Sequence, residues 1–365
     1  MKPVLVVNSG SSSVKYQLID VDSETALRSG LLERVTDHSA AFTHMLAELD
    51  GVVPVAVGHR VVHGGSEFSR PTLIDAGVLA SIEALSSLAP LHNPGNALGI
   101  RAAMAGYPEL PQVAVFDTAF HQSMPASSYR YAIDSALEKN FKIRRYGFHG
   151  SSHSFVARKA ADFLGKPADQ FTGVILHLGN GASACAIKNG KSFDTSMGFT
   201  PLQGLVMGSR SGDIDPAIVA YLSREAGLSI DEIDASLNKN SGLLGMTGDA
   251  DLRDVIARSD AGDQVATDAL DVYAQRVKHY IGAYIAELGP IDAVVFTAGV
   301  GENSSAMRER IMRGLEHLGL QLSVEANQAP ARGARSIAAT DSSREILVIP
   351  TNEELEIAIQ TAIFV

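Results

Sequence analysis

The chain has 365 residues, with 30 Lys and Arg against 41 Asp and Glu, so its formal net charge is −11. A chain this acidic is a poor candidate for non-specific binding to nucleic acid or to anionic membranes. Its single cysteine, Cys185, excludes an internal disulfide framework and fits a reducing compartment, so we expect a cytoplasmic protein. We find no apolar run of about 18 residues that would span a membrane and no cleavable signal at the N-terminus.

Strand-like and helix-like stretches alternate along the chain, which indicates an α/β fold. In the first part, strands are predicted at residues 3–7, 14–19, 53–58 and 112–116, and a helix at 149–164. The second part has predicted strands at 173–178, 182–187, 293–296 and 346–349, a hairpin turn at 188–191, and helices at 268–288 and 352–363.

The two parts share a weak internal repeat. Near residue 4 and again near residue 174, an apolar strand leads into a polar, Gly-containing turn and a second strand. Two similar α/β halves facing each other across a cleft would explain it. The length also suggests two domains, and we place their boundary near residue 150, giving domains 1–150 and 151–351. We expect the last helix, at about 352–365, to pack back on the first domain.

The first turn, residues 8–15, is built for close approach to a phosphate. Small residues let the backbone come near a ligand, and Lys15 just after the turn offers a positive charge. The pattern is not the nucleotide P-loop, which needs Gly-x-x-x-x-Gly-Lys before a helix. An ordinary polar hairpin turn is the alternative.

Two charged residues follow predicted strands of the first half. Arg60 stands where a strand meets its loop and suits a carboxylate or phosphate, with a surface salt bridge as the alternative. Asp117 directly follows an apolar strand, where open α/β sheets place functional groups, with a helix cap as the alternative.

The histidines do not predict a zinc site. His59 and His63 are four residues apart, as are His149 and His153, but the context is Gly-rich and no His-Glu-x-x-His pattern is completed. The Gly150-Ser151-Ser152 stretch could be mistaken for the nucleophile elbow of a hydrolase. It does not match the Gly-x-Ser-x-Gly pattern that such an elbow requires.

Further candidates lie in the second half and at the C-terminus. Gly-x-Gly turns follow two strands, at residues 179–181 and 299–301, and Arg210 stands alone in a Gly/Ser loop, which favours a ligand role. Asn352 fits the N-cap of the last helix and Glu354 its first turn, which leaves Glu353 for magnesium. Arginines, a lysine, acids and Gly turns together match phosphoryl transfer.

At this point the sequence resembles the acetate kinase family over nearly its whole length. The resemblance is carried by residues 6–16, 58–65, 116–121, 146–150, 177–181, 207–216, 298–303 and 351–355. It implies an α/β fold of duplicated ribonuclease H-like (actin-like ATPase) domains with a nucleotide cleft between them. The implied reaction is reversible, direct in-line phosphoryl transfer from ATP to acetate, giving ADP and acetyl phosphate. It also implies Mg²⁺, for which Mn²⁺ can substitute, and a homodimer whose interface lies in the second domain, with no nucleic-acid or membrane partner.

The resemblance also implies roles for individual residues. The catalytic residues would be Arg60, Asp117, His149 and Arg210; the metal ligands Asn8 and Glu353; the phosphate-loop residues Ser11 and Ser13; and the substrate pocket Arg60, Val62, Leu91, Phe148 and Pro201. The nucleotide site would comprise Lys15, His177, Leu178, Gly179, Asn180, Gly181, Asp251, Leu252, Arg253, Gly299, Val300, Gly301, Glu302 and Asn303.

The chain departs from the family pattern in two places. Leu252 stands where Phe is usual, and the stretch between Lys15 and Arg60 is shorter than the family pattern. Val62 favours acetate over propionate, although one methylene is worth only about 1–3 kcal/mol in such a pocket. A kinase for propionate, butyrate or another short-chain carboxylate is the alternative function, and a non-catalytic nucleotide-binding scaffold is a more remote one.

Overall fold

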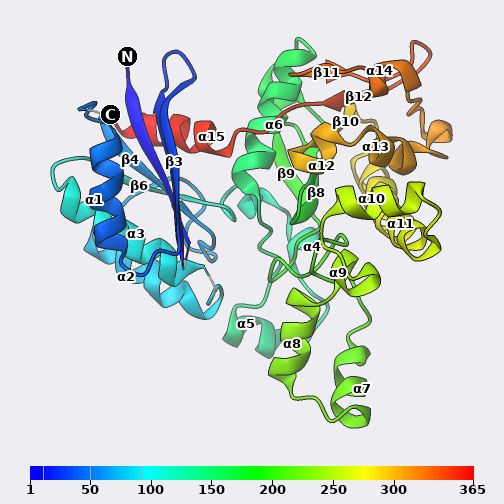
Figure 1. The fold of residues 1–365 in the computed structure, drawn as a ribbon, viewed down its shortest axis with the longest axis horizontal. Helices are drawn as coiled ribbons and strands as arrows, with labels where there is room; N and C mark the ends of the chain where they lie inside the picture. Colours follow the sequence, from blue (N-terminus) through cyan, green and yellow to red (C-terminus); the bar gives the residue numbers. More distant parts are fainter. Residues whose placement is uncertain (11, 50, 91) are drawn as a thin grey trace. The chain divides into compact units, whose positions relative to one another are not determined.

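The computed structural model describes residues 1–10, 12–49, 51–90 and 92–365 (Figure 1). These residues form two compact units that interleave along the chain. Unit 1 contains Met1–Gln122, Phe148–Phe155 and Asn352–Val365, and unit 2 contains Ser123–Gly147 and Val156–Thr351. No helix in the described ranges is long and apolar enough to cross a membrane.

Unit 1 is built on a six-stranded mixed sheet with the order β3-β2-β1-β4-β6-β5. Strands β1, β2 and β3 form an antiparallel meander, β1, β4 and β6 run parallel, and β5 pairs antiparallel with β6. The strands are β1 (Pro3–Ser9), β2 (Ser13–Asp20), β3 (Thr25–Glu33), β4 (Ala56–Val61), β5 (Thr72–Leu73) and β6 (Gln112–Phe116).

Unit 2 repeats this topology strand for strand. Its sheet has the order β11-β12-β10-β7-β8-β9, with an antiparallel β7–β8–β9 meander, parallel β7, β10 and β12, and antiparallel β11. The strands are β7 (Gly173–Leu178), β8 (Ala182–Lys188), β9 (Lys191–Thr195), β10 (Ala293–Thr297), β11 (Arg335–Ser336) and β12 (Glu345–Val348). The duplicated α/β architecture predicted from the weak internal repeat is therefore confirmed.

Helices cover the sheets. Unit 1 contains α1 (His38–Glu48), α2 (Ala76–Ala84), α3 (Asn93–Gly106) and α15 (Glu353–Thr361), and α6 (Gly150–Phe163) begins in it. Unit 2 contains α4 (Ala126–Tyr129), α5 (Ser135–Phe141), α7 (Ala217–Glu225), α8 (Ile230–Lys239), α9 (Gly242–Thr247), α10 (Leu252–Asp260), α11 (Gln264–Leu288), α12 (Ala298–Asn303), α13 (Ser305–Met312) and α14 (Val324–Gln328).

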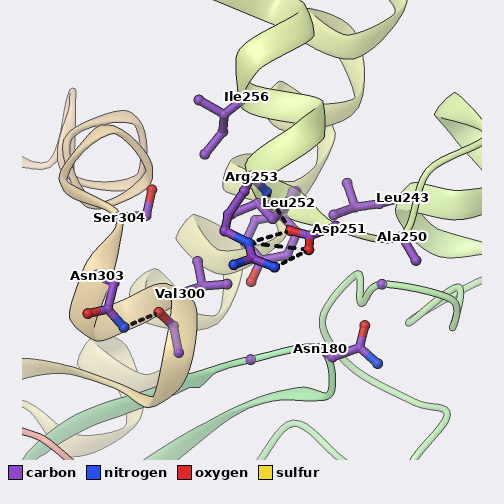
Figure 2. A pocket seen from close by; sticks show the side chains of 14 residues that line it. Asn180, Leu243, Ala250, Asp251, Leu252, Arg253, Ile256, Val300, Asn303 and Ser304 are labelled. Carbon is purple, nitrogen blue, oxygen red and sulfur yellow. Dashed lines mark hydrogen bonds and ion pairs between the residues drawn. The ribbon is translucent and has the colours of Figure 1, made fainter.

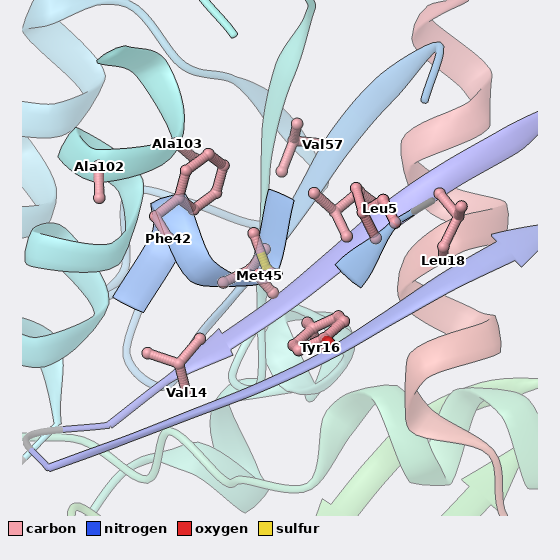
Figure 3. Packing of buried hydrophobic residues seen from close by; sticks show 11 residues of the cluster. Leu5, Val14, Tyr16, Leu18, Phe42, Met45, Val57, Ala102 and Ala103 are labelled. Carbon is pink, nitrogen blue, oxygen red and sulfur yellow. The ribbon is translucent and has the colours of Figure 1, made fainter. Parts of the chain in front are cut away.

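The two faces of the unit 1 sheet pack against different helices. Leu5 and its parallel partner Val57 join one buried cluster with Phe42 and Met45 of α1 and with residues of α3 (Figure 3). Side chains alternate along a strand, so a Cβ at Gly58, the next residue of β4, would point to the opposite face. A Cβ at Gly58 would collide with Thr361 of α15, so α15 lies against that second face.

Most predicted elements are confirmed, with small shifts in their ends. Strands β6 and β7 have the predicted bounds, and Asn189 and Gly190 form the predicted hairpin turn with φ of 52° and 72°. Strand β4 begins at Ala56 rather than at residue 53, because Pro54 has no N–H for a strand ladder. The predicted turn at 299–301 is wrong in type, since these residues lie in the short helix α12.

Candidate active site

Strand alternation brings four predicted site residues of unit 1 to the face covered by α15. Arg60 is two residues after Gly58 on β4, so it points to the same face. Its neighbour on β6 is Val115, so Asp117, two residues further on, follows on that face too. On β1, Asn8 is two residues beyond Val6, the partner of Gly58, and Asn8 pairs with Lys15 across the β1–β2 ladder.

Arg60 and Asp117 form a two-point ion pair. Arg60 Nε donates to Asp117 Oδ1 at 3.0 Å, and Nη2 donates to Oδ2 at 2.7 Å. The contact with Asp117 raises the pKa of Arg60. Burial raises the pKa of Asp117, which is 1% exposed, and the guanidinium opposes this shift. The salt bridge named as the alternative for Arg60 is thus present, but it is internal and leaves the Nη1 donors without a described acceptor.

Asp117 is also joined through its backbone to the start of α6. Gly150 N–H donates to the Asp117 carbonyl at 2.9 Å, and a Cβ at position 150 would collide with that carbonyl oxygen. His149, one residue earlier, has a left-handed backbone with φ of 58°. Such a conformation is costly for a non-Gly residue and clusters at functional sites.

The first turn of α15 brings two acids to this group. Asn352 caps the helix as predicted, its Oδ1 accepting from Leu355 N–H at 3.0 Å. A carboxylate oxygen of Glu353 lies 4.0 Å from Arg60 Nε. Glu354 forms an ion pair with Lys15, so Lys15 has an acidic partner that sequence reasoning missed.

Asn8 and Glu353 each offer an oxygen donor of the kind that magnesium binds. Both are half-buried, and the Glu353 side chain is 21% exposed. No group of three or more His, Cys, Asp and Glu among the described residues could hold a metal ion by itself. Magnesium commonly binds through one or two protein oxygens together with water and substrate phosphates, and this donor set fits that mode.

The residues predicted for the acyl pocket are divided between the units. Val62 and Phe148 are buried in unit 1, where the Phe148 ring lies 5.6 Å from that of His63 and its carbonyl is 2.9 Å from His121 Nε2. Pro201 belongs to unit 2. Ser11 and Leu91 lie outside the described residues, and Ser13 opens β2, its carbonyl accepting from Gly10 N–H at 2.8 Å.

Unit 2 contains a cavity of about 810 Å³ at the C-terminal ends of β7 and β10 (Figure 2). Its lining includes eight of the residues predicted for the nucleotide: Gly179, Asn180, Asp251, Leu252, Arg253, Gly299, Val300 and Asn303. Leu243, Ile256 and Tyr273 add apolar walls that sequence reasoning did not name. An apolar cavity with a few polar groups at its edge suits a nucleoside.

Hydrogen bonds within the protein hold two polar side chains at this cavity. Arg253 Nε donates to Asp251 Oδ1 at 3.0 Å, and Asn303 Nδ2 donates to the Gly299 carbonyl at 2.8 Å (Figure 2). Leu252, which stands where the family pattern has Phe, is 7% exposed and belongs to the apolar part of the lining.

Other predicted nucleotide residues stand outside the lining. His177 and Leu178 are buried at the end of β7, while Gly181 and Gly301 belong to the adjoining turn and helix. Glu302 Oε1 instead accepts from Thr351 N–H at 3.1 Å.

A buried arginine supports α12, and sequence reasoning missed it. Arg308 is 2% exposed and donates to the carbonyls of Gly301 and Glu302, both at 2.9 Å, and to Asn327 Oδ1 at 2.7 Å. Burial lowers its pKa to about 10. The only sequence signal is an Arg five residues after Asn303, which an exposed helix would equally explain.

Arg210 has no acidic partner among the described residues. Its Nη1 lies 3.4 Å from the Pro201 carbonyl and 3.7 Å from Met207 Sδ, and burial lowers the pKa of its guanidinium. A half-buried cation without a counter-ion is suited to an anionic ligand.

The fold and the site together define the class of protein. Two duplicated α/β units, a nucleoside-sized cavity, and arginines beside acids are typical of a phosphotransferase.

Comparison with known proteins identifies the family. The profile of the acetokinase family matches residues 3–53 and 37–359, and the chain belongs to this family of kinases with a carboxylate acceptor. The acetate kinase of Leifsonia xyli is 55% identical over 389 aligned positions that cover 99% of this chain and 98% of the relative.

Two solved structures resemble this chain over at least 99% of its length. That of Porphyromonas gingivalis acetate kinase has a TM-score of 0.96 at 39% identity, covering 100% of this chain and 99% of that one. A propionate kinase from Francisella tularensis has a TM-score of 0.93 at 42% identity, covering 99% of each chain. The family and fold predicted from the sequence are confirmed.

Proposed function

We propose that this chain is an acetate kinase that transfers the γ-phosphoryl group of ATP to acetate in a reversible reaction. The observation that carries the proposal is the fixed guanidinium of Arg60. Asp117 holds it at 3.0 and 2.7 Å, and its Nη1 donors are left for a carboxylate or an acyl phosphate.

The reaction needs no general base. Acetate is already ionised near pH 7, so one of its oxygens attacks the γ-phosphorus as the bond from phosphorus to the ADP oxygen breaks. Asp117 therefore serves as the group that orients Arg60 rather than as a proton acceptor. Its internal pairing with Arg60 supports this role.

The main task of the protein is to offset negative charge. The phosphoryl group passes between anionic acetate and anionic ADP, so cations must balance the charge that develops. We assign this task to Arg60, Arg210 and Lys15, with His149 as a further donor. Lys15 must exchange its partner Glu354 for a phosphate oxygen.

Magnesium would be held by Asn8 and Glu353, with water and ATP phosphates as further ligands, and Mn²⁺ could replace it. When bound, the ion neutralises phosphate charge. Glu353 lies 4.0 Å from Arg60, so the metal ligand and the acyl-binding cation belong to one polar cluster of unit 1.

The adenosine of ATP would occupy the unit 2 cavity, with Leu252 and Val300 as apolar walls and the Gly179–Asn180–Gly181 turn next to the phosphates. The size and lining of the cavity support this assignment. We also propose that the chain forms a homodimer through residues of 151–351 and resides in the cytoplasm.

Propionate is the second candidate substrate. The Francisella tularensis neighbour is a propionate kinase with a TM-score of 0.93 to this chain, so this fold is compatible with either acid. Val62 favours acetate because a smaller residue there would leave room for one more methylene.

ADP release measured with a coupled assay tests the proposal. It should require acetate and a divalent cation together. Arg60→Ala and Arg210→Ala should each lower turnover by about 100-fold, because each removes a donor that acts on developing charge. The matched control is Arg101→Ala, an arginine of unit 1 that is 57% exposed and pairs with Glu83. Wild-type turnover in either site variant would contradict the proposed roles.

A further inference from the structure

The loop between β9 and α7 carries Arg210 and has a defined internal structure despite lacking a helix or strand. Leu205 and Met207 are fully buried in it. Backbone hydrogen bonds join Met207 N–H to the Arg210 carbonyl at 3.2 Å and Asp213 N–H to the Gly204 carbonyl at 2.9 Å. Residues 204 and 213 therefore meet and close the loop.

The side chain of Asp213 secures this closure. Its Oδ1 accepts from Gly204 N–H at 3.0 Å, and its Oδ2 accepts from the Tyr280 hydroxyl at 2.8 Å and lies 3.5 Å from Arg276 Nη1. Tyr280 and Arg276 both belong to α11. One carboxylate thus ties the base of the loop to the longest helix of unit 2.

The loop in turn sets the direction of Arg210. Both described contacts of its guanidinium, to Pro201 and Met207, lie within or beside the loop. Arg276 and Tyr280 take up the Asp213 carboxylate, so Asp213 holds the loop without forming an ion pair with Arg210.

We propose that Asp213 is a positioning residue that fixes the Arg210 guanidinium through loop closure and through α11. The inference rests on the proposed function, in which Arg210 acts on the transferred phosphoryl group. A displacement of about 1 Å of a catalytic group can cost on the order of 100-fold in rate, so loosening the loop should reduce turnover.

Three variants measure the effect. Asp213→Ala should lower kcat by about tenfold or more and change the KM for ATP by less than about threefold, because Gly208 is the only described residue of the loop that lines the nucleoside cavity. Asp213→Asn keeps an acceptor for Gly204 and should recover part of the loss. The matched control is Asp215→Ala, an exposed Asp that accepts from Ala217 N–H at 2.9 Å, and it should keep wild-type kcat.

A double-mutant cycle separates positioning from general stability. If Asp213 acts through Arg210, Asp213→Ala combined with Arg210→Ala should be no slower than Arg210→Ala alone, measured as product accumulated over hours at high enzyme concentration. Losses that multiply would overturn the inference, as would wild-type kcat in Asp213→Ala.

Two further controls keep the outcome clear. If Asp213→Ala does not fold, Tyr280→Phe removes one hydrogen bond and keeps the packing, and it should give a smaller loss that is likewise absent in the Arg210→Ala background. Wild-type turnover in Arg210→Ala would overturn the proposed role of Arg210 itself. A slow Arg210→Ala with a fast Asp213→Ala would overturn only the positioning role.

Discussion

Arg60 and Asp117 come from neighbouring parallel strands and meet through two hydrogen bonds of 3.0 and 2.7 Å. The pairing follows from strand register. Arg60 lies beside Val115, and Asp117, the residue directly after β6, is two positions further along on the same face. A planar guanidinium held along one edge has fewer orientations to lose when a carboxylate binds its free donors.

Asp117→Asn should therefore impair acetate use without abolishing nucleotide binding. The amide cannot balance the Arg60 charge or accept along two N–H bonds equally well. We expect kcat/KM for acetate to fall by about 100-fold, measured by steady-state kinetics, with little change in ATP affinity. Glu83→Gln, at the exposed partner of Arg101, is the control. An unchanged kcat/KM for acetate would contradict the orienting role.

Gly150→Ala should damage both stability and activity. The added methyl group would collide with the Asp117 carbonyl, and overpacking of this kind costs about 1–3 kcal/mol. The control is Gly282→Ala in α11, where an added Cβ meets nothing within 4 Å. This substitution should stabilise the protein by about 0.5–1 kcal/mol, because alanine favours the helix over glycine. Thermal unfolding and turnover of both variants test this prediction. If Gly150→Ala had the melting temperature of the wild type, the close approach of Gly150 to the Asp117 carbonyl would be contradicted.

Buried His59 should make the protein less stable in mild acid. Burial lowers its pKa from 6.5 to about 4, so the unfolded chain binds a proton that the folded chain does not. Above about pH 6.5, where His59 is neutral in both states, it does not reduce the free energy of unfolding. As the pH falls from about 6.5 toward 4, protonation of the unfolded chain lowers that free energy by an amount approaching about 3 kcal/mol.

The matching variant is His59→Gln, which keeps a hydrogen-bonding group near Gln112, now 2.8 Å from His59 Nε2. Denaturant unfolding between pH 7 and 4 should show a shallower pH dependence than wild type. His279→Gln, at an exposed histidine, should leave the dependence unchanged. Parallel curves for wild type and His59→Gln would rule out His59 as a source of acid sensitivity.

Val62→Ala should shift the acyl preference toward larger acids. The valine is 8% exposed, and its N–H donates to Asn96 Oδ1 at 3.1 Å, so its backbone is fixed and only the side-chain volume changes. Because a methylene is worth about 1–3 kcal/mol, the propionate-to-acetate ratio of kcat/KM should rise by about tenfold or more. No change in the ratio would place the acyl group elsewhere.

Local sequence patterns predicted the duplication and eight of the twelve described strands, but not β3, β5, β9 or β11. Strand β7 is buried on both faces and is apolar apart from His177, and the Asn189–Gly190 turn has a single strong signal. Short-range patterns suffice for such elements because burial and turn chemistry act within a few residues.

The missing features depend on residues that are distant in sequence. The pairing of Lys15 with Glu354 spans most of the chain. Asn96 donates to the Ser9 carbonyl at 2.7 Å and also accepts from Val62, and neither partner can be inferred from an Asn inside a helix. Nothing local in the sequence singles out Arg308, because its acceptors are backbone carbonyls that only tertiary packing brings to it.

The most direct test of the central claim is acyl phosphate formation from ATP and Mg²⁺, trapped as the hydroxamate, with acetate, propionate and butyrate assayed side by side. We predict that acetate leads by tenfold or more in kcat/KM. A lead for propionate or butyrate would contradict the substrate assignment. No product from any of the three, with folded protein that binds ATP, would contradict acyl phosphate synthesis itself.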